Sequence, residues 1–171
     1  MNIVEVRVNG LIVESKTQQN IVLLREAEGT RILPIWIGPG EAQAIRRLLA
    51  EEAFPRPLTH DLLCLVVEGL HAKVTRIVIA DLRENTFFAS VFIERESEVL
   101  SIDARPSDSI AIALRARAPI YVNDKLLQQP PAAEPESEEE EPRELTDEEK
   151  AEQLRRYLEK LNPEDFGKFQ F

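Results

Sequence analysis

The chain has 171 residues and a formal net charge of -10, a length that allows one domain with a real core plus an appendage. The charge is unevenly distributed: residues 1–129 contain 15 basic and 17 acidic side chains, and residues 130–171 contain 6 and 14. An acidic total argues against a polyanionic partner, because nucleic-acid-binding proteins usually carry a basic face. The nearly neutral body nevertheless leaves such a partner open.

The N-terminus and the single cysteine indicate the cellular compartment in which the protein is expected. The chain does not start with basic residues followed by an unbroken apolar stretch, so we expect no secretory signal. No apolar run approaches the roughly 20 residues of a membrane span. Cys64 lies within the apolar run of residues 62–67, which favours a buried structural thiol. We therefore expect a cytoplasmic protein without a membrane partner.

The first half of the body predicts three strands followed by two helices. The strands are indicated by apolar and polar alternation and by β-rich runs, and the helices by apolar residues at helical spacing. The expected strands are Val4–Val8, Ile21–Leu24 and Ile32–Ile37, and the expected helices are Glu41–Glu52 and Thr59–Leu70.

The second half shows a similar order. It predicts strands at Val74–Leu82, Thr86–Ile93 and Val99–Asp103, a helix at Ser107–Arg117, a short extended piece at Tyr121–Val122 and a last turn at Lys125–Leu127. A shift of 67 residues superimposes Pro39 on Pro106 and Ala44 on Ala111. We therefore expect an α+β fold, a mixed sheet with helices packed on it, built by duplication of a three-strand, two-helix motif; chance similarity between two strand-to-helix junctions is the alternative.

The C-terminal part divides into a linker and a helix. Residues 129–143 are rich in proline and glutamate and are predicted to be a linker, since they offer little apolar surface to bury. Residues 144–171 form the predicted helical tail, beginning with a Thr146-x-x-Glu149 capping box and carrying an apolar stripe that includes Leu154 and Leu158. The body is then residues 1–128, and the helix needs a surface on which to dock.

Polar groups gather at the starts of the predicted helices. A helix start presents unpaired backbone N–H groups and a partial positive charge, which together can hold a phosphate. Arg56 and Arg105 precede two of these starts and can grip phosphate oxygens with two donors. With Ser107 they are the predicted substrate-binding residues, provided that folding brings Arg56 and Arg105 to one hollow.

Phosphodiester hydrolysis also needs an activated water and a way to neutralise developing charge. His60, Asp61 and Asp108 are the predicted catalytic residues. Glu41, Asp103 and Asp108 are predicted to hold a divalent metal ion, Mg or Mn. The competing interpretation is structural: Thr59 and Ser107 are N-caps, and the acids stabilise first turns through the helix dipole. In this interpretation Arg56 and Arg105 form ion pairs with the same acids.

Three stretches resemble the bifunctional nuclease family, which is named for activity on both DNA and RNA. They are residues 33–41, residues 54–62 and residues 102–111, and their spacing is kept within residues 1–128. The resemblance implies a single α+β domain, often self-associated as a homodimer or other homo-oligomer, that hydrolyses DNA and RNA. It carries no firm catalytic assignment.

Two functions therefore compete. The first is a nuclease that hydrolyses DNA and RNA, with metal assistance. The second is a non-enzymatic regulatory module that binds an anion between Arg56 and Arg105 and a protein partner through the C-terminal helix. A third possibility combines the two: the acidic tail covers the basic residues of a nucleic-acid-binding groove and competes with the nucleic acid until the tail is displaced.

Overall fold

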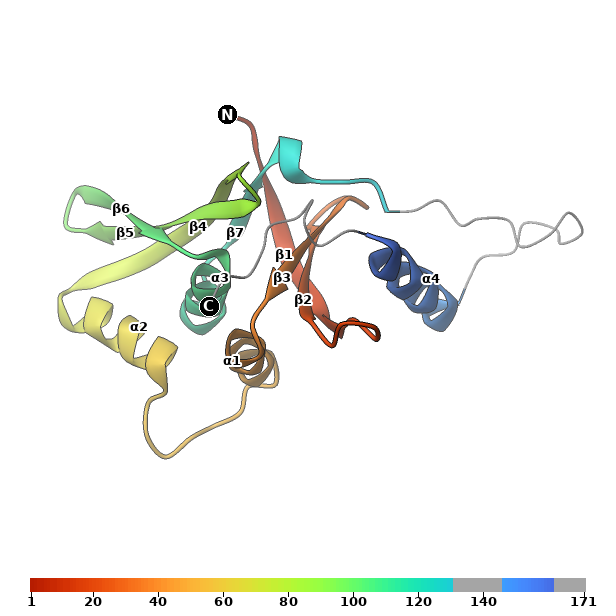
Figure 1. Cartoon of the computed structure of the whole chain (residues 1–171). Helices are drawn as coiled ribbons and strands as arrows, with labels where there is room; N and C mark the ends of the chain where they lie inside the picture. Colours follow the sequence, from red (N-terminus) through yellow and green to blue (C-terminus); the bar gives the residue numbers. More distant parts are fainter. Residues whose placement is uncertain (131–145, 162–171) are drawn as a thin grey trace, which may run out of the picture.

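The computed structural model describes residues 1–130 and 146–161, and in these ranges seven strands form one mixed sheet in the order β3-β2-β1-β7-β4-β5-β6 (Figure 1). The elements are β1 (Ile3–Val13), β2 (Asn20–Glu26), β3 (Ile32–Ile37), α1 (Pro39–Leu49), α2 (Thr59–Gly69), β4 (Ala72–Arg83), β5 (Thr86–Arg95), β6 (Glu98–Ala104), α3 (Pro106–Ala116), β7 (Ile120–Asn123), the 3-10 turn η1 (Asp124–Leu126) and α4 (Asp147–Lys160). The predicted α+β class is confirmed.

Two antiparallel three-stranded units are joined through β7. Strands β1–β3 and β4–β6 each pair in chain order, and β7 lies between them, antiparallel to β1 and parallel to β4. The predicted repeat holds for three strands and one helix. After α3 the chain enters β7 and η1, as the predicted extended piece at Tyr121–Val122 and the predicted last turn at Lys125–Leu127 indicated, so the second copy lacks the second helix of the motif. Ile120 and Val122 of β7 are both buried in the core between the two units, as alternate residues of a strand can be.

Local sequence accounts for two details of the sheet. Glu84 and Asn85 both have positive φ, 48° and 60°, as the two-residue turn of the tight β4–β5 hairpin requires, and asparagine adopts this conformation readily. Pro34 lies within β3, which is an edge strand of the sheet. An edge strand tolerates proline because the missing N–H faces away from the neighbouring strand.

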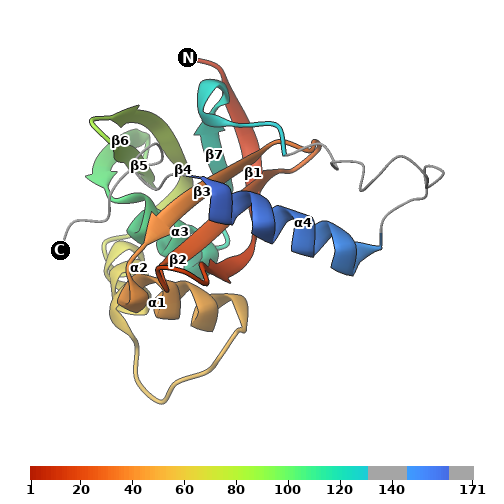
Figure 2. The same ribbon diagram turned by 45° about the vertical axis from the view of Figure 1, so that its right-hand side comes forward.

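Helices cover the two halves of the sheet differently. Helices α1, α2 and α3 lie on one face, and α4 lies across the opposite face of β1–β3 (Figures 1 and 2). Side chains 21–24 of β2 are therefore all buried, although successive residues of a strand point to opposite faces. By contrast, β6 is an edge strand on which Val99, Leu100 and Ile102 are exposed. The α2–β6 side of the molecule thus carries uncovered apolar surface.

The predicted C-terminal helix is confirmed over Asp147–Lys160, and it docks on the chain itself. Thr146 accepts a hydrogen bond from the Glu149 N–H, and the Thr146 N–H donates to Glu149 Oε2 at 2.8 Å, as the capping box predicted. Leu158 is 1% exposed, and the Ser15 hydroxyl donates to Glu159 Oε1 at 2.6 Å. The division between body, linker and tail stays a prediction, since residues 131–145 and 162–171 lie outside the described residues.

Within the described ranges, no helix is both long and apolar enough to span a bilayer.

Candidate functional site

Side chains from the first turns of α1, α2 and α3 form one connected set of hydrogen bonds. Arg105, the N-cap residue of α3, donates from Nη1 to Glu41 Oε1 at 3.1 Å and from Nε to Asp108 Oδ2 at 2.8 Å. The other Asp108 oxygen, Oδ1, lies 3.0 Å from His60 Nε2. We call Glu41, His60, Arg105 and Asp108 the helix-start network. It connects residues that are 48 and 64 positions apart in the sequence.

The local sequence explains why the helices begin at these residues. Pro39 and Pro106 each occupy the start of a helix, where a missing N–H costs nothing and the fixed φ suits the helix. Their N-caps, Gly38 and Arg105, are extended and make no side-chain capping bond. Backbone N–H groups at these starts are therefore not satisfied by their own cap side chains, which suits an anion site.

The charges of the network are mutually stabilised. The hydrogen bond from His60, with that from Arg105 and the Arg105 charge, lowers the pKa of Asp108 from 3.8 to about 2. The hydrogen bond to Asp108 in turn raises the pKa of Arg105. Asp108 is therefore ionised at neutral pH. Because His60 Nε2 faces this carboxylate, it carries the proton, and in the neutral ring Nδ1 is the free acceptor.

Asp61, predicted to be catalytic, lies outside the network. Its Oδ2 accepts from the Leu58 N–H at 2.9 Å and its Oδ1 accepts from Arg115 Nε at 2.8 Å. Asp61 thus caps α2 and ties it to α3, as the structural interpretation of the first-turn acids predicted. Sequence reasoning missed Arg115, whose only signal is a basic residue in the last turn of a helix.

The predicted N-caps are displaced by one or two residues. Leu58 and Arg105 hold the N-cap positions of α2 and α3, so Thr59 is the first residue of its helix and Ser107 the second. Ser107 is buried, which leaves it poorly placed to bind substrate directly.

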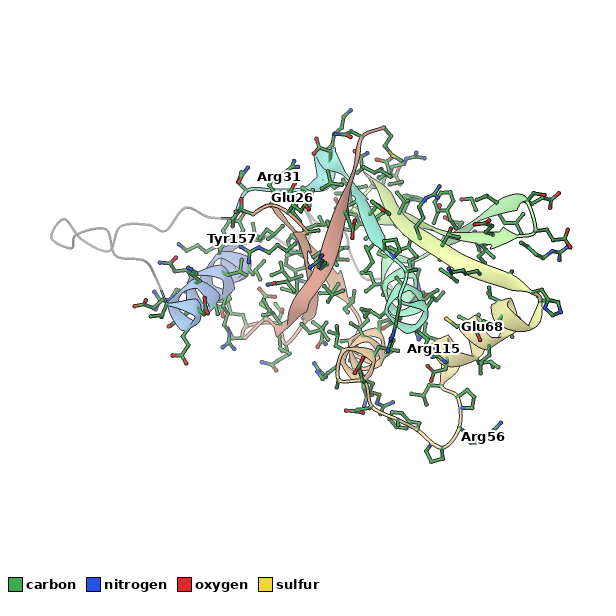
Figure 3. All side chains as sticks on the ribbon, turned by 180° about the vertical axis from the view of Figure 1, so that it is seen from behind. Glu26, Arg31, Arg56, Glu68, Arg115 and Tyr157 are labelled. Carbon is green, nitrogen blue, oxygen red and sulfur yellow. The ribbon has the colours of Figure 1, made fainter. Side chains whose placement is uncertain are left out.

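The two predicted phosphate-binding arginines differ in their surroundings. Arg105 lies within the network, whereas Arg56 is exposed on the loop between α1 and α2 and extends away from the body of the protein (Figure 3). Arg56 makes no hydrogen bond or ion pair with the residues that the structure describes. The expected pairing of Arg56 and Arg105 at one hollow is therefore not formed, and Arg105 is the phosphate-binding candidate that the fold supports.

The predicted metal ligands do not fit a metal ion. Within residues 1–130 and 146–161, no group of three or more His, Cys, Asp or Glu side chains is arranged to hold one. Glu41 and Asp108 are bridged by the Arg105 guanidinium, which holds one oxygen of each, and Asp103 is exposed on β6. A cation would have to displace that arginine, so we derive no catalytic step through a metal.

The low pKa of Asp108 predicts acid lability. A carboxylate whose folded pKa lies below its unfolded value stabilises the fold above the unfolded pKa and loses this contribution as pH falls through the folded one. The stabilisation, about 2 kcal/mol for a shift from 3.8 to about 2, should be complete above about pH 5 and fade between about pH 4 and 2. Urea unfolding across this range should show the wild type converging on Asp108→Asn. A difference in free energy of unfolding between wild type and Asp108→Asn that does not change with pH would contradict the prediction. Asp103→Asn, on exposed β6, is the control and should follow the wild type across the same pH range.

The residues of the helix-start network lie inside a match to a known family. The family model described as the bifunctional nuclease domain matches residues 22–134. The chain belongs to the bifunctional nuclease domain family. The resemblance seen in the three sequence stretches is confirmed, and the match extends from β2 through η1.

Relatives fall into two groups. An uncharacterized protein of Mycobacterium tuberculosis is 42% identical over 162 residues, covering 95% of this chain and 97% of its own length. Bifunctional nuclease 1 of Oryza sativa is 26% identical over 116 residues, or 66% of this chain and 35% of the rice protein. Bifunctional nuclease 1 of Arabidopsis thaliana is 28% identical over 109 residues, or 61% of this chain and 34% of its own. This chain thus resembles about a third of each plant protein.

Proposed function

We propose that the chain hydrolyses phosphodiester bonds of DNA and RNA at the helix-start network. One observation carries the proposal: Asp108 uses one oxygen to hold His60 and the other to hold Arg105. A proton acceptor and a phosphate-binding guanidinium are thereby fixed to the same carboxylate, close to the starts of two helices.

The chemistry assigns each side chain a role. His60 Nδ1 removes a proton from a water molecule, whose oxygen attacks phosphorus while the bond to the leaving sugar oxygen breaks. The leaving oxygen takes a proton from solvent, and the imidazolium later returns its proton to solvent. Asp108 orients the imidazole and stabilises the imidazolium that forms. Arg105 Nη2, which has no partner among the described residues, donates to a phosphate oxygen and offsets the charge that develops there. Glu41 holds the guanidinium in place.

Activity on both nucleic acids agrees with this site, because none of these roles uses the ribose 2′-hydroxyl. The plant relatives are named bifunctional nucleases, which also supports the proposed nuclease activity. Divalent metal dependence stays a prediction, since the predicted carboxylate site is not formed in the described part of the chain. Cytoplasmic location also stays a prediction.

The test is a cleavage assay on the purified full chain. Labelled single-stranded DNA and RNA of the same sequence are incubated with fractions across a gel-filtration peak, with and without EDTA. Cleavage of both substrates should follow the protein peak. Cleavage that persists in EDTA would support the roles assigned to His60, Asp108 and Arg105 without a metal ion. Cleavage that is lost in EDTA and restored by added Mg or Mn would show that hydrolysis depends on a metal ion and would exclude these metal-free roles. Absence of cleavage under every condition would exclude the proposal.

A regulatory module without catalysis is less well supported. The apolar stripe of α4 packs on the chain's own sheet, with Leu158 in the core cluster. A protein partner for this helix would have to bind its charged faces. A nucleic-acid affinity that does not change with salt would favour the module, since phosphate contacts produce a steep salt dependence.

We also propose that the chain self-associates through α2. Leu62, Val66 and Leu70 follow one another at four-residue spacing and are 55%, 50% and 59% exposed. An apolar helical stripe of this kind is typical of a protein interface. Val66→Glu should shift a dimer or larger oligomer to monomer in gel filtration with light scattering, and Leu49→Glu on α1 should not. A wild-type chain that is monomeric at high concentration would exclude this interface.

A further inference from the structure

An apolar groove opens beside the helix-start network, between α2 and the β5–β6 hairpin. Its volume is about 490 Å³, within the range of about 300–1,000 Å³ that is usual for small-ligand sites. The lining consists of Leu63, Cys64, Val67, Val74, Val91, Ile93, Ile102, Asp103, Ala104, Arg105, Asp108 and Ile112. Most of these side chains are aliphatic, and the charged ones belong to β6 and to the start of α3.

The walls of the groove are fixed by the sheet register. Val91 lies opposite Ile102 in the β5–β6 ladder, so both point to the same face of the sheet. Val91 is buried and forms the floor, whereas Ile102 is 47% exposed and forms the rim. Cys64 adds to the apolar lining: burial raises the pKa of its thiol, and Sγ lies 3.9 Å from the Ile112 carbonyl oxygen.

Charge at the mouth of the groove points to its occupant. Arg105 lines the groove, belongs to the network and has a 56% exposed side chain. Asp103 and Asp108 also line the groove, and Arg105 Nε and Nη1 already bond Asp108 and Glu41, so an anion has to meet Arg105 at Nη2. A ligand that fits has an apolar portion among the aliphatic side chains and a single anionic group at this nitrogen. A nucleotide within a strand has these two parts, a flat base and a phosphate, joined by one sugar.

We propose that this groove binds one nucleobase of the strand whose phosphate is held by Arg105. The proposal rests on the proposed function and extends it to a base-binding subsite. Enzymes that act on unpaired or flipped nucleotides hold the base in a similar way, between aromatic or apolar side chains. A base within a duplex cannot enter the groove without first leaving its stack.

Two properties of the substrate follow. The strand is single-stranded, or carries an unpaired nucleotide, where it meets the network. Base identity matters little, because the aliphatic walls contact the faces of the base and do not read its edges.

The test compares two ligands that differ only in their bases. Fluorescence anisotropy measures binding of the full chain to a phosphorothioate-linked thymidine hexamer, which resists cleavage, and to an abasic hexamer with the same backbone. The thymidine hexamer should bind at least tenfold more tightly. Ile102→Glu, which places a charge at the groove rim, should abolish this difference. Val99→Glu, the same change on the opposite face of β6, should leave it within twofold of the wild type.

The outcomes separate the subsite from the proposed function. Equal affinity of the wild type for both hexamers overturns the base-binding subsite and leaves phosphate binding intact, and this comparison holds even if Ile102→Glu does not fold. Failure to bind either hexamer at low salt removes the proposed function as well. If Ile102→Glu changes the oligomeric mass but keeps the tenfold difference, the groove is part of an interface between copies, and the subsite is excluded.

Discussion

His60→Asn is expected to lower the rate of DNA and RNA cleavage by about 10²- to 10⁴-fold, the usual contribution of a general base. The two substrates should lose activity in parallel, because one imidazole serves both. The asparagine amide is too short to replace the bond from His60 Nε2 to Asp108. The bond from Arg105 Nε to Asp108 Oδ2 does not involve the imidazole, so the ion pair between Asp108 and Arg105 should persist. The measurement is kcat on matched DNA and RNA oligonucleotides, with circular dichroism to confirm the fold.

The chain supplies a matched control for this substitution. His71 is the other histidine, exposed in the turn between α2 and β4 with a φ of 57°, a conformation that asparagine tolerates. His71→Asn, purified in the same way, should retain full activity. Equal activity of the two variants would mean that His60 is not the base, and contamination would then be the first explanation for any cleavage.

Leu158→Ala is expected to lower the free energy of unfolding by about 2–5 kcal/mol, the usual cost of truncating a buried leucine. Leu158 is 1% exposed and is the only fully buried residue of α4 in the described ranges. Because α4 lies on the face of the sheet opposite α1–α3 (Figure 2), nuclease activity at a permissive temperature should be kept. Chemical denaturation and kcat together test both parts.

Lys160→Ala is the control on the same helix, since its side chain is exposed and its removal should change stability by less than about 0.5 kcal/mol. If Leu158→Ala were as stable as the wild type, α4 would not be docked in solution.

The docking of α4 also affects how an inhibitory acidic tail can be tested. Truncation after Gln128 is a poor test because it removes α4 and exposes the apolar face of β2 and β3. Replacing the acidic residues of the linker with glutamine keeps the docked helix.

Sequence alone determined the local elements. Alternation and helical spacing predicted the strands and helices of the body to within three residues, except that β1 continues five residues beyond the predicted end at Val8. Thr146 with Glu149 predicted the start of α4. These patterns are readable because a strand or an amphipathic helix repeats its burial over a few neighbouring residues. Residues 33–41, 54–62 and 102–111 also indicated the family.

The tertiary structure decided which polar residues meet. The sequence placed six charged residues and a histidine near helix starts but did not show which of them meet. Packing joined His60, Asp108, Arg105 and Glu41 and paired Asp61 with Arg115. It also left Arg56 in solvent and inserted β7 between the two three-stranded units. Such contacts depend on helix packing and strand order across separations of 48 residues or more, and no local periodicity encodes them.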